Sequence, residues 1–178
     1  MNIAVYLSST FGVKEEYALR TKELGSWIGK NHHTLVYGGS KTGLMDILSD
    51  AVLEEGGKVI GVETTFFAEQ GKGKENLTEF ILTPDMKTRK EKMRSLADAS
   101  IALPGGVGTL DEIAETICLD TLSPKHKPIL FYNVAHYYDP LKEQFDKMVE
   151  EGFLRKEFRN RISFCDTLEE IEARLATE

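Results

Sequence analysis

A glycine-rich turn, PGGVGT at residues 104–109, is the strongest candidate in this sequence for binding a ligand. The turn directly follows the apolar run 100–103 and precedes an amphipathic stretch that begins near Thr109. Glycines let the backbone turn sharply and let its N–H groups approach a ligand, and a helix N-terminus adds the positive end of a dipole. The pattern predicts a cradle for one phosphate group, with the Thr109 hydroxyl as an additional donor; a tight turn without a ligand is the alternative.

Polar segments also follow two other apolar runs. GGSKTG at 38–43 comes after the run 34–37, and residues 8–12, which include Ser9, come after the N-terminal run 2–7. Neither glycine-rich turn has the Gly-Lys-Ser/Thr spacing of a P-loop or the G-x-G-x-x-G spacing of a dinucleotide-binding turn. Nucleoside triphosphatases and nicotinamide dehydrogenases are therefore disfavoured.

Two cations lie along the expected core face of a helix at residues 85–98. Arg89 and Lys90 fall between Met86 and Met93 at spacings of three and four, where a purely structural helix would carry Leu or Ala. Such cations can face a ligand, and arginine suits phosphate or ribose oxygens. They can also snorkel to solvent or form structural ion pairs. The other cations of this helix are expected to be solvated: Lys87, Lys92 and Arg94.

The helix after the glycine-rich turn carries two carboxylates, Glu112 and Glu115, on the same face as Thr109. Its core face is expected to consist of Leu110, Ile113, Ala114 and Ile117. Acids near a helix start are common because of the helix dipole, so each alone is weak evidence. Together they lie close to the predicted phosphate site. Because they would repel the phosphate itself, we expect them to act on the neighbouring neutral sugar.

Short apolar runs alternate with amphipathic stretches along the whole chain. The runs predicted as buried strands are 2–7, 34–37, 58–62, 79–82, 100–103 and 128–132. Strands that alternate with helices form a mostly parallel sheet with helices on both faces. We therefore expect residues 1–178 to form a single α/β domain of Rossmann-like type. Ligands bind at the carboxyl ends of such strands, where the three polar segments lie, and the aperiodic stretch 63–77 is expected to be a loop over the site.

Composition restricts the class of protein. The formal net charge of -7 argues against a nucleic-acid partner, because phosphate backbones select basic surfaces. No apolar run approaches the roughly 20 residues of a membrane span, so we expect no membrane partner. The N-terminal run lacks the basic start of a signal peptide, and we expect a cytoplasmic location.

The cysteines and histidines do not form a metal-binding pattern. Cys118 and Cys165 lie far apart and outside any CxxC pair, so we expect two reduced cysteines in the core. The histidines fall in expected loops or strand edges and are assigned no role: His32, His33, His126 and His136. We expect neither a metal nor a cofactor.

Two motifs give the sequence a family resemblance. PGGVGTLDE at 104–112 fits the pattern PGGxGTxxE, and MKTRK at 86–90 fits the M-x-x-R-K part of its companion motif. In these motifs the chain resembles the Lonely Guy family of cytokinin-activating phosphoribohydrolases, which were often labelled lysine decarboxylases. The resemblance extends through 35–45, 51–62 and 127–153, and so covers most of the chain.

The resemblance implies hydrolysis of the N-glycosidic bond of AMP or of an N6-substituted AMP, which releases the base and ribose 5-phosphate. It implies that Arg89 and Glu112 are the catalytic pair. The residues expected to bind substrate or to support its binding are Ser9, Gly39, Glu75, Lys90, Gly105, Gly106, Val107, Gly108, Thr109 and Glu115. The resemblance also implies a homodimer, and the mixed face of the helix 85–98, with its two methionines, suggests that this helix lies at the interface.

Cleavage of an N-glycoside passes through an oxocarbenium-like state, which a carboxylate near the anomeric carbon can stabilise. Glu112 is the candidate for this role, and Arg89 would orient the ribose phosphate and stabilise the leaving base. Two other functions are considered. A non-catalytic nucleotide sensor or carrier would need the phosphate cradle but not Glu112. A pyridoxal phosphate decarboxylase would need a Schiff-base lysine and a partner for the pyridinium, and no pattern marks either.

The sequence departs from the family pattern at several positions. It has Tyr6-Leu7 in place of Cys-Gly, Ser40 in place of a third glycine, Glu63-Thr64 in place of Ile-Pro, Lys87 in place of His, Cys118 in place of Thr and Leu119 in place of Trp. The glycine-rich turn and the Arg/Glu pair are intact. We therefore expect the departures to affect recognition of the ribose and the base rather than of the phosphate.

Overall fold

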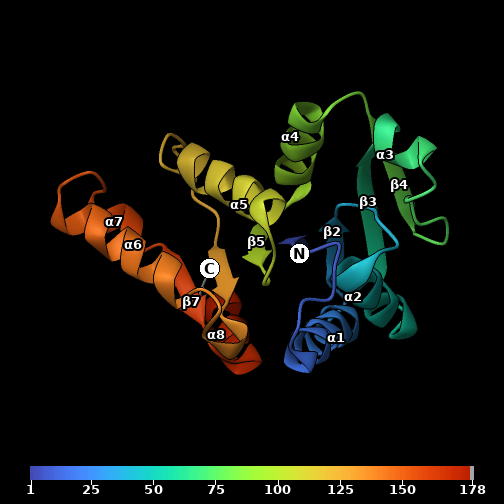
Figure 1. Cartoon of the computed structure of the whole chain (residues 1–178), viewed down its shortest axis with the longest axis horizontal. Coiled ribbons are helices and arrows are strands. Elements are labelled where there is room, and N and C mark those ends of the chain that lie inside the picture. Colours follow the sequence, from blue (N-terminus) through green and yellow to red (C-terminus); the bar gives the residue numbers. More distant parts are fainter. Residues whose placement is uncertain (177–178) are drawn as a thin grey trace.

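The computed structural model describes residues 1–176, and within that range it has one parallel β-sheet of seven strands (Figure 1). In chain order the strands are β1 (Asn2–Tyr6), β2 (Thr34–Tyr37), β3 (Lys58–Thr64), β4 (Glu79–Thr83), β5 (Ala99–Ala102), β6 (Ile129–Tyr132) and β7 (Ile162–Cys165). In space their order is β4-β3-β2-β1-β5-β6-β7, and every neighbouring pair is parallel. The prediction of a Rossmann-like α/β fold is confirmed.

The apolar runs located the strands well, with one omission. The six predicted runs coincide with β1 to β6 to within two residues at each end. The seventh strand, β7, was not predicted. It has only four residues, ISFC, at the edge of the sheet, and two of them are half-buried, so it gives little apolar signal.

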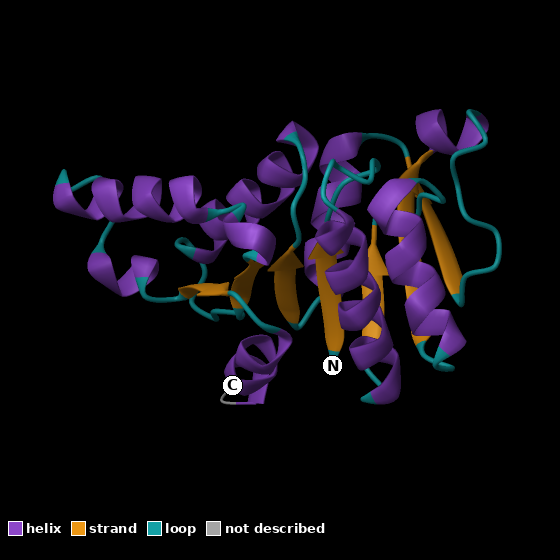
Figure 2. Ribbon diagram, turned by 60° about the horizontal axis from the view of Figure 1, so that its bottom comes forward, coloured by secondary structure: helices purple, strands orange, loops and turns teal. Residues whose placement is uncertain are grey.

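The helices pack around this sheet (Figure 2). They are α1 (Glu15–Lys30), α2 (Gly43–Glu54), α3 (Thr65–Glu69), α4 (Met86–Leu96), α5 (Val107–Asp120), α6 (Asp139–Glu150), α7 (Lys156–Arg159) and α8 (Leu168–Ala176), with a short 3-10 helix at Val134–His136. Among the described residues, no helix combines the length and the apolar character that a membrane crossing requires.

The sheet buries two hydrophobic cores, one on each face. Residues of α1, α2 and α8 pack in one core, and residues of α4, α5 and α6 pack in the other. Successive side chains of a strand point to opposite faces. In β1, accordingly, Ile3 and Val5 belong to the first core, whereas Ala4 and Tyr6 belong to the second. The expected covering of both faces by helices is confirmed.

The order of the strands reverses at β1, and this reversal creates the crevice for a site. The chain adds β2, β3 and β4 on one side of β1 and then returns to place β5 on the other side. The connections that leave β1 and β5 therefore diverge, and such a switch point leaves an open crevice at the carboxyl ends of the strands. The three polar segments of the sequence follow β1, β2 and β5, so the topology brings them together.

The segment 63–77 is not the plain loop that its lack of periodicity suggested. The strand β3 continues through Thr64, and the helix α3 follows directly. The Thr64 hydroxyl accepts a hydrogen bond from the Phe67 N–H at 3.4 Å and so caps this helix. A helix of five residues is too short to give a readable periodic pattern, which explains the error.

Lys74 fastens the remainder of this segment to α2. Its Nζ lies 2.7 Å from Asp46 Oδ1 and 2.6 Å from Asp50 Oδ1, and its side chain is buried. Its backbone N–H also donates to the Gly39 carbonyl at 2.9 Å. The segment after α3 is therefore held against the turn 38–43 at the carboxyl end of β2.

The buried face of α5 differs from the prediction. The buried residues are Thr109, Glu112, Ile113, Thr116 and Ile117. Leu110 and Ala114, which were expected in the core, are exposed. The helix instead turns polar groups inward, and Thr116 Oγ1 lies 3.2 Å from the buried Tyr6 hydroxyl. An apolar pattern identifies the inner face only when that face does not also form a polar site.

Only one cysteine lies in the core. Cys165 on β7 is buried, and its burial raises the pKa of the thiol to about 11. Cys118 on α5 is exposed, so the prediction of two core cysteines is wrong for it. The reason is the rotation of α5 just described, which points Cys118 away from the sheet.

Candidate active site

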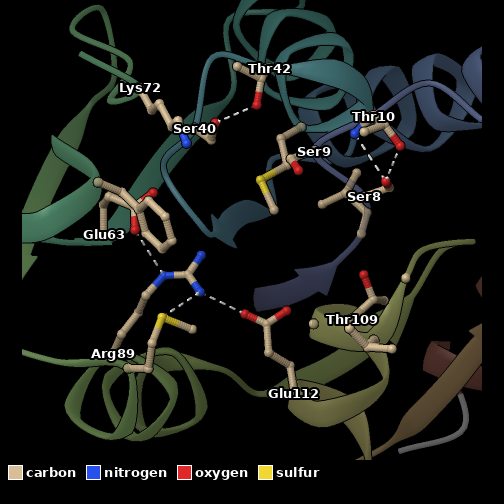
Figure 3. Close-up of a pocket in the computed structure, with 17 residues that line it drawn as sticks. Ser8, Ser9, Thr10, Ser40, Thr42, Glu63, Lys72, Arg89, Thr109 and Glu112 are labelled. Carbon is tan, nitrogen blue, oxygen red and sulfur yellow. Dashed lines mark hydrogen bonds and ion pairs between the residues drawn. The ribbon is translucent and has the colours of Figure 1, made fainter. Parts of the chain in front are cut away.

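A cavity of about 680 Å³ lies at the carboxyl ends of β1, β2 and β3, beside the N-terminus of α5 (Figure 3). It is lined by Leu7, Ser8, Ser9, Thr10, Ser40, Thr42, Met45, Glu63, Phe67, Lys72, Met86, Arg89, Gly106, Val107, Gly108, Thr109 and Glu112. The residues of this set that the sequence predicted for the site are Ser9, Arg89, Gly106, Val107, Gly108, Thr109 and Glu112. The cavity therefore occupies the crevice that the strand order creates.

One wall of the cavity is the N-terminus of α5. Gly106 is its N-cap residue, and no described side chain caps the N–H groups of its first turn. The Thr109 side chain lies against Gly105, where an added Cβ would collide with it. The Tyr137 hydroxyl donates to the Gly105 carbonyl at 2.6 Å, which fixes the turn. A fixed turn with free N–H groups and the positive end of a helix dipole is suited to bind an anion.

Arg89 lies buried in a second wall. Its Nε donates to the Val62 carbonyl at 2.9 Å, and its Nη2 donates to the Gly38 carbonyl at 3.2 Å. Its Nη1 donates to Glu112 Oε1 at 2.9 Å. The residue is 5% exposed, so the guanidinium is removed from bulk water and held by groups from β3, from α5 and from the turn after β2.

Glu112 is the partner of Arg89 and is equally buried, at 5% exposure. Burial raises the pKa of its carboxyl group, and the charge of Arg89 opposes this effect. The carboxylate faces the same cavity as the N-terminus of α5. It is therefore placed to interact with positive charge that develops on a bound ligand.

Glu63 is a second buried carboxylate of the cavity, and the sequence did not predict it as a site residue. It lies near the end of β3 and is 3% exposed. Its Oε1 accepts the Thr64 N–H at 2.8 Å and lies 3.5 Å from Arg89 Nε. Burial raises its pKa, and Arg89 lowers it to a smaller extent. Figure 3 shows Arg89 between Glu63 and Glu112.

A signal for Glu63 was present in the sequence. A carboxylate at the end of an apolar strand is unusual unless it is paired or functional. Because the aperiodic stretch 63–77 begins with Glu63, the sequence predicted a loop residue there rather than a site residue.

The third side of the cavity is more apolar. The helix α3 contributes Phe67, and the segment after it contributes Lys72, whose Nζ lies 5.1 Å from the centre of the Phe67 ring. Met45 and Met86 add further apolar surface. An aromatic ring and thioethers form a surface on which a flat ring of a ligand can stack.

Lys90 and Glu115 do not line the cavity. Lys90 Nζ lies 2.8 Å from Asp111 Oδ2 and 3.3 Å from Glu115 Oε2. Arg94 Nη1 lies 2.6 Å from the same Glu115 oxygen, so the expectation that Arg94 is merely solvated is wrong. These ion pairs connect α4 to α5 and so help to fix the helices that carry Arg89 and Glu112.

The remaining predicted residues also lie outside the cavity lining. Glu75 is exposed in the segment after α3. Gly105 lines a smaller neighbouring cavity of about 210 Å³. Gly39 has a φ of 71°, a left-handed conformation that favours glycine, and its carbonyl accepts the hydrogen bond from Lys74. Gly39 therefore shapes the turn rather than the cavity surface.

The histidines and cysteines contribute nothing to the cavity lining. Among residues 1–176, no group of three or more His, Cys, Asp and Glu side chains is arranged to hold a metal ion. His126 and His136 instead lie near carboxylates, at 3.1 Å from Asp120 and 3.4 Å from Asp139. The charged side chains that line the cavity are those of Glu63, Lys72, Arg89 and Glu112.

We predict that Gly38 tolerates no side chain, because a Cβ there would collide with Arg89 Nη2. Gly38→Ala is expected to lower the free energy of unfolding by about 1–3 kcal/mol, the usual cost of overpacking. Urea unfolding of Gly38→Ala, of Arg89→Ala and of the double variant measures this effect. In the Arg89→Ala background most of the cost should disappear. An equal cost in both backgrounds would contradict the close approach.

Known proteins resemble this chain over nearly its whole length. Residues 45–175 match the family model described as possible lysine decarboxylase. The chain is 39% identical over 173 residues to a probable cytokinin riboside 5′-monophosphate phosphoribohydrolase of Oryza sativa subsp. japonica, covering 97% of this chain and 71% of the relative. It is 36% identical over 169 residues to a cytokinin riboside 5′-monophosphate phosphoribohydrolase of Rhodococcoides fascians, covering 94% and 85%.

The fold also resembles solved structures of more distant proteins. The molybdenum cofactor binding protein from the phototrophic bacterium Rippkaea orientalis superposes with a TM-score of 0.73 at 19% identity, covering 99% of this chain and 95% of that one. At such identity the likeness concerns the fold alone. The family model spans both motifs, 86–90 and 104–112, and the two relatives cover almost all of this chain. The chain therefore belongs to the family described as possible lysine decarboxylases, the Lonely Guy family of cytokinin riboside 5′-monophosphate phosphoribohydrolases.

Proposed function

We propose that this chain hydrolyses the N-glycosidic bond of a nucleoside 5′-monophosphate, AMP or an N6-substituted AMP, to the free base and ribose 5-phosphate. The observation that carries the proposal is the buried Arg89–Glu112 pair in a cavity that also contains the N-terminus of α5. The names of the two relatives support the same reaction class. The side chains that carry out the proposed reaction are those of Arg89 and Glu112.

The phosphate of the substrate binds at the N-terminus of α5. Backbone N–H groups of Gly106, Val107 and Gly108 and the Thr109 hydroxyl supply the donors. Binding energy from a group remote from the cleaved bond places that bond against the catalytic residues. With the phosphate at this wall, the ribose falls beside Glu112 and the base reaches toward Phe67.

Glu112 stabilises the positive charge that develops at the anomeric carbon and receives a proton from the attacking water. Arg89 holds the Glu112 carboxylate in place through the 2.9 Å hydrogen bond. Arg89 has five N–H groups, and four of them contact described residues: one on Nε, two on Nη1 and one on Nη2. The second N–H of Nη2 has no such contact. That N–H is available to a ribose oxygen, so Arg89 both positions Glu112 and contacts the substrate.

The replacement Glu112→Gln tests this mechanism. It retains the shape of the side chain but removes its charge, so kcat for AMP should fall about 100-fold or more, the usual effect of losing one such group. Affinity for AMP, measured by calorimetry, should change little, because the phosphate wall is intact. Glu91→Gln is the matched control, since Glu91 is an exposed glutamate of α4 outside the cavity lining, and it should retain wild-type activity.

Two outcomes would contradict the proposal. If Glu112→Gln releases adenine within threefold of the wild-type rate, the mechanism is wrong. If the wild-type protein and the variant both bind AMP equally and neither releases adenine, the protein is a nucleotide sensor or carrier. Such a protein needs the phosphate wall but gives no role to the buried carboxylate.

We predict an acid limb in the pH profile of kcat/KM at a higher pH than an ordinary glutamate would give. Glu112 must be ionised to act, and burial raises the pKa of its carboxyl group. A raised carboxyl pKa means that the folded chain binds this proton more tightly than the unfolded chain does. Stability contributed by this proton is therefore present at low pH and lost as pH rises through the folded pKa. Activity should fall on acidification while circular dichroism still reports a folded chain; an acid limb that follows unfolding would contradict this.

We further propose that the chain forms a homodimer through the outer side of α5. The exposed side chains there form a stripe at spacings of three and four: Val107, Leu110, Ala114, Cys118 and, just beyond the helix, Leu122. Val107 and Leu122 are 87% and 76% exposed, which is unusual for residues without a partner. Met93 of α4, a helix expected near the interface, is instead buried in the chain's own core.

Leu110→Glu tests the dimer. A charge in the middle of the stripe should convert the dimer to a monomer, as seen by sedimentation velocity at micromolar concentration. Leu19→Glu, on the exposed side of α1, is the control and should leave the oligomer unchanged. A wild-type protein that sediments as a monomer would contradict the proposed homodimer.

We also propose a cytoplasmic location. Cys118 and Cys165 are free thiols, which suits a reducing compartment. Fractionation of cells that express the tagged protein tests this directly.

A further inference from the structure

The cavity holds two carboxyl groups, and the proposed reaction as described so far uses only one of them. Glu63 and Glu112 come from β3 and α5, and both lie against the guanidinium of Arg89. Both are almost fully buried. The Oε1 atom of Glu63 is occupied by the Thr64 N–H, but Oε2 has no hydrogen bond to any described residue. No buried side-chain oxygen of the described residues lacks a partner, so this unpartnered Oε2 is open to the cavity and is available to a ligand.

Charge balance indicates that this cluster retains a proton. Two ionised carboxylates beside one guanidinium leave an excess negative charge in a region shielded from water. Burial raises the pKa of both glutamates, with Arg89 as the main opposing influence on each. Lys72, from the segment after α3, is the other cation that acts on Glu63, and its effect is smaller. The cluster therefore favours one neutral and one ionised carboxyl group.

The geometry places the proton on Glu63. Glu112 Oε1 accepts a hydrogen bond of 2.9 Å from Arg89 Nη1, which stabilises its ionised form. Glu63 Oε1 lies 3.5 Å from Arg89 Nε, and that Nε–H donates to the Val62 carbonyl instead. The positive charge of the guanidinium therefore stabilises the ionised form of Glu112 more than it stabilises the ionised form of Glu63. Two carboxyl groups in unequal environments are the usual arrangement for an acid and a base in one site.

Glu63 also lies where the base of the substrate belongs. Figure 3 shows Glu63 and Thr109 on opposite sides of the cavity, with Arg89 and Glu112 between them. A nucleotide with its phosphate at Thr109 therefore extends its base toward Glu63 and Phe67. Glu63 and Glu112 are the only carboxyl groups that line the cavity among the described residues, and that lining contains no His, Cys, Asp or Tyr side chain.

We propose that Glu63 is a second catalytic residue, the general acid that protonates the departing base. The inference rests on the proposed phosphoribohydrolase function. A purine leaves as an anion unless a ring nitrogen is protonated as the glycosidic bond breaks. A correctly placed acid lowers this barrier by a factor of about 100 to 10,000.

The atoms and charges of the step balance as follows. The bond between C1′ and the base nitrogen breaks, its electron pair goes to the base, and the carboxyl proton of Glu63 goes to a ring nitrogen. The water oxygen bonds to C1′, and one water proton goes to Glu112. Transfer of that proton through solvent to Glu63 restores the starting state. One water molecule is consumed, and the free base and ribose 5-phosphate are released.

The test compares two leaving groups in the intact protein. AMP requires protonation of its base, whereas 4-nitrophenyl β-ribofuranoside 5-phosphate releases a nitrophenolate that leaves without a proton. Glu63→Gln should lower kcat for AMP about 100-fold or more and change kcat for the nitrophenyl substrate by less than about fivefold. Glu112→Gln should lower both. Glu69→Gln, an exposed glutamate on α3, is the matched control and should lower neither.

A second measurement uses only the wild-type protein. With AMP, kcat should fall on the alkaline side as Glu63 loses its proton, and with the nitrophenyl substrate this alkaline limb should be absent. Calorimetric binding of AMP to Glu63→Gln verifies that the variant is folded.

The outcomes separate the two proposals. Equal losses on both substrates in Glu63→Gln, AMP hydrolysis by that variant within threefold of wild type, or the same alkaline limb for both substrates would each overturn the role of Glu63 while leaving the hydrolase intact. A wild-type protein that cleaves neither substrate would instead overturn the proposed function itself, and the role of Glu63 with it.

Discussion

A guanidinium removed from water must be compensated by hydrogen bonds and opposite charge, and Arg89 obtains both from three separate elements. The turn after β2 supplies the Gly38 carbonyl, β3 supplies the Val62 carbonyl and Glu63, and α5 supplies Glu112. Removal of Glu112 would leave the buried guanidinium without its ionised partner, and removal of a carbonyl would leave one of its N–H groups without an acceptor. The burial of the Arg89 side chain therefore depends on the relative positions of β2, β3, α4 and α5.

Several local features are consequences of that burial. Gly38 must lack a side chain because the guanidinium occupies the space that a Cβ would take. The face of α5 that points inward is polar, because Glu112 must reach Arg89. The ion pairs of Lys90 and Arg94 with α5 hold the two helices at the spacing that the pair requires. The fold thus provides rigid support for a charge cluster beside the open N-terminus of a helix.

Much of this arrangement could be predicted from the sequence, and the failures have physical reasons. Apolar runs located β1 to β6 because fully buried strands have a continuous apolar signal. The motif residues Arg89 and Glu112 stood out because charges interrupt helical apolar stripes. Glu63 was missed because its role depends on contacts with Arg89, which is distant in sequence. The exposure of Leu110 was missed because apolar periodicity does not reveal that α5 turns the polar residues of the site inward.

The most direct test of the account is the release of products by the wild-type protein from AMP and from adenosine. The account predicts equal amounts of adenine and ribose 5-phosphate from AMP, and a much smaller kcat/KM for adenosine, because only AMP carries the phosphate that the N-terminus of α5 binds. Equal values for the two substrates would show that this helix end does not position the substrate. Binding of AMP without release of adenine would contradict the assignment of the buried Arg89–Glu112 pair to catalysis.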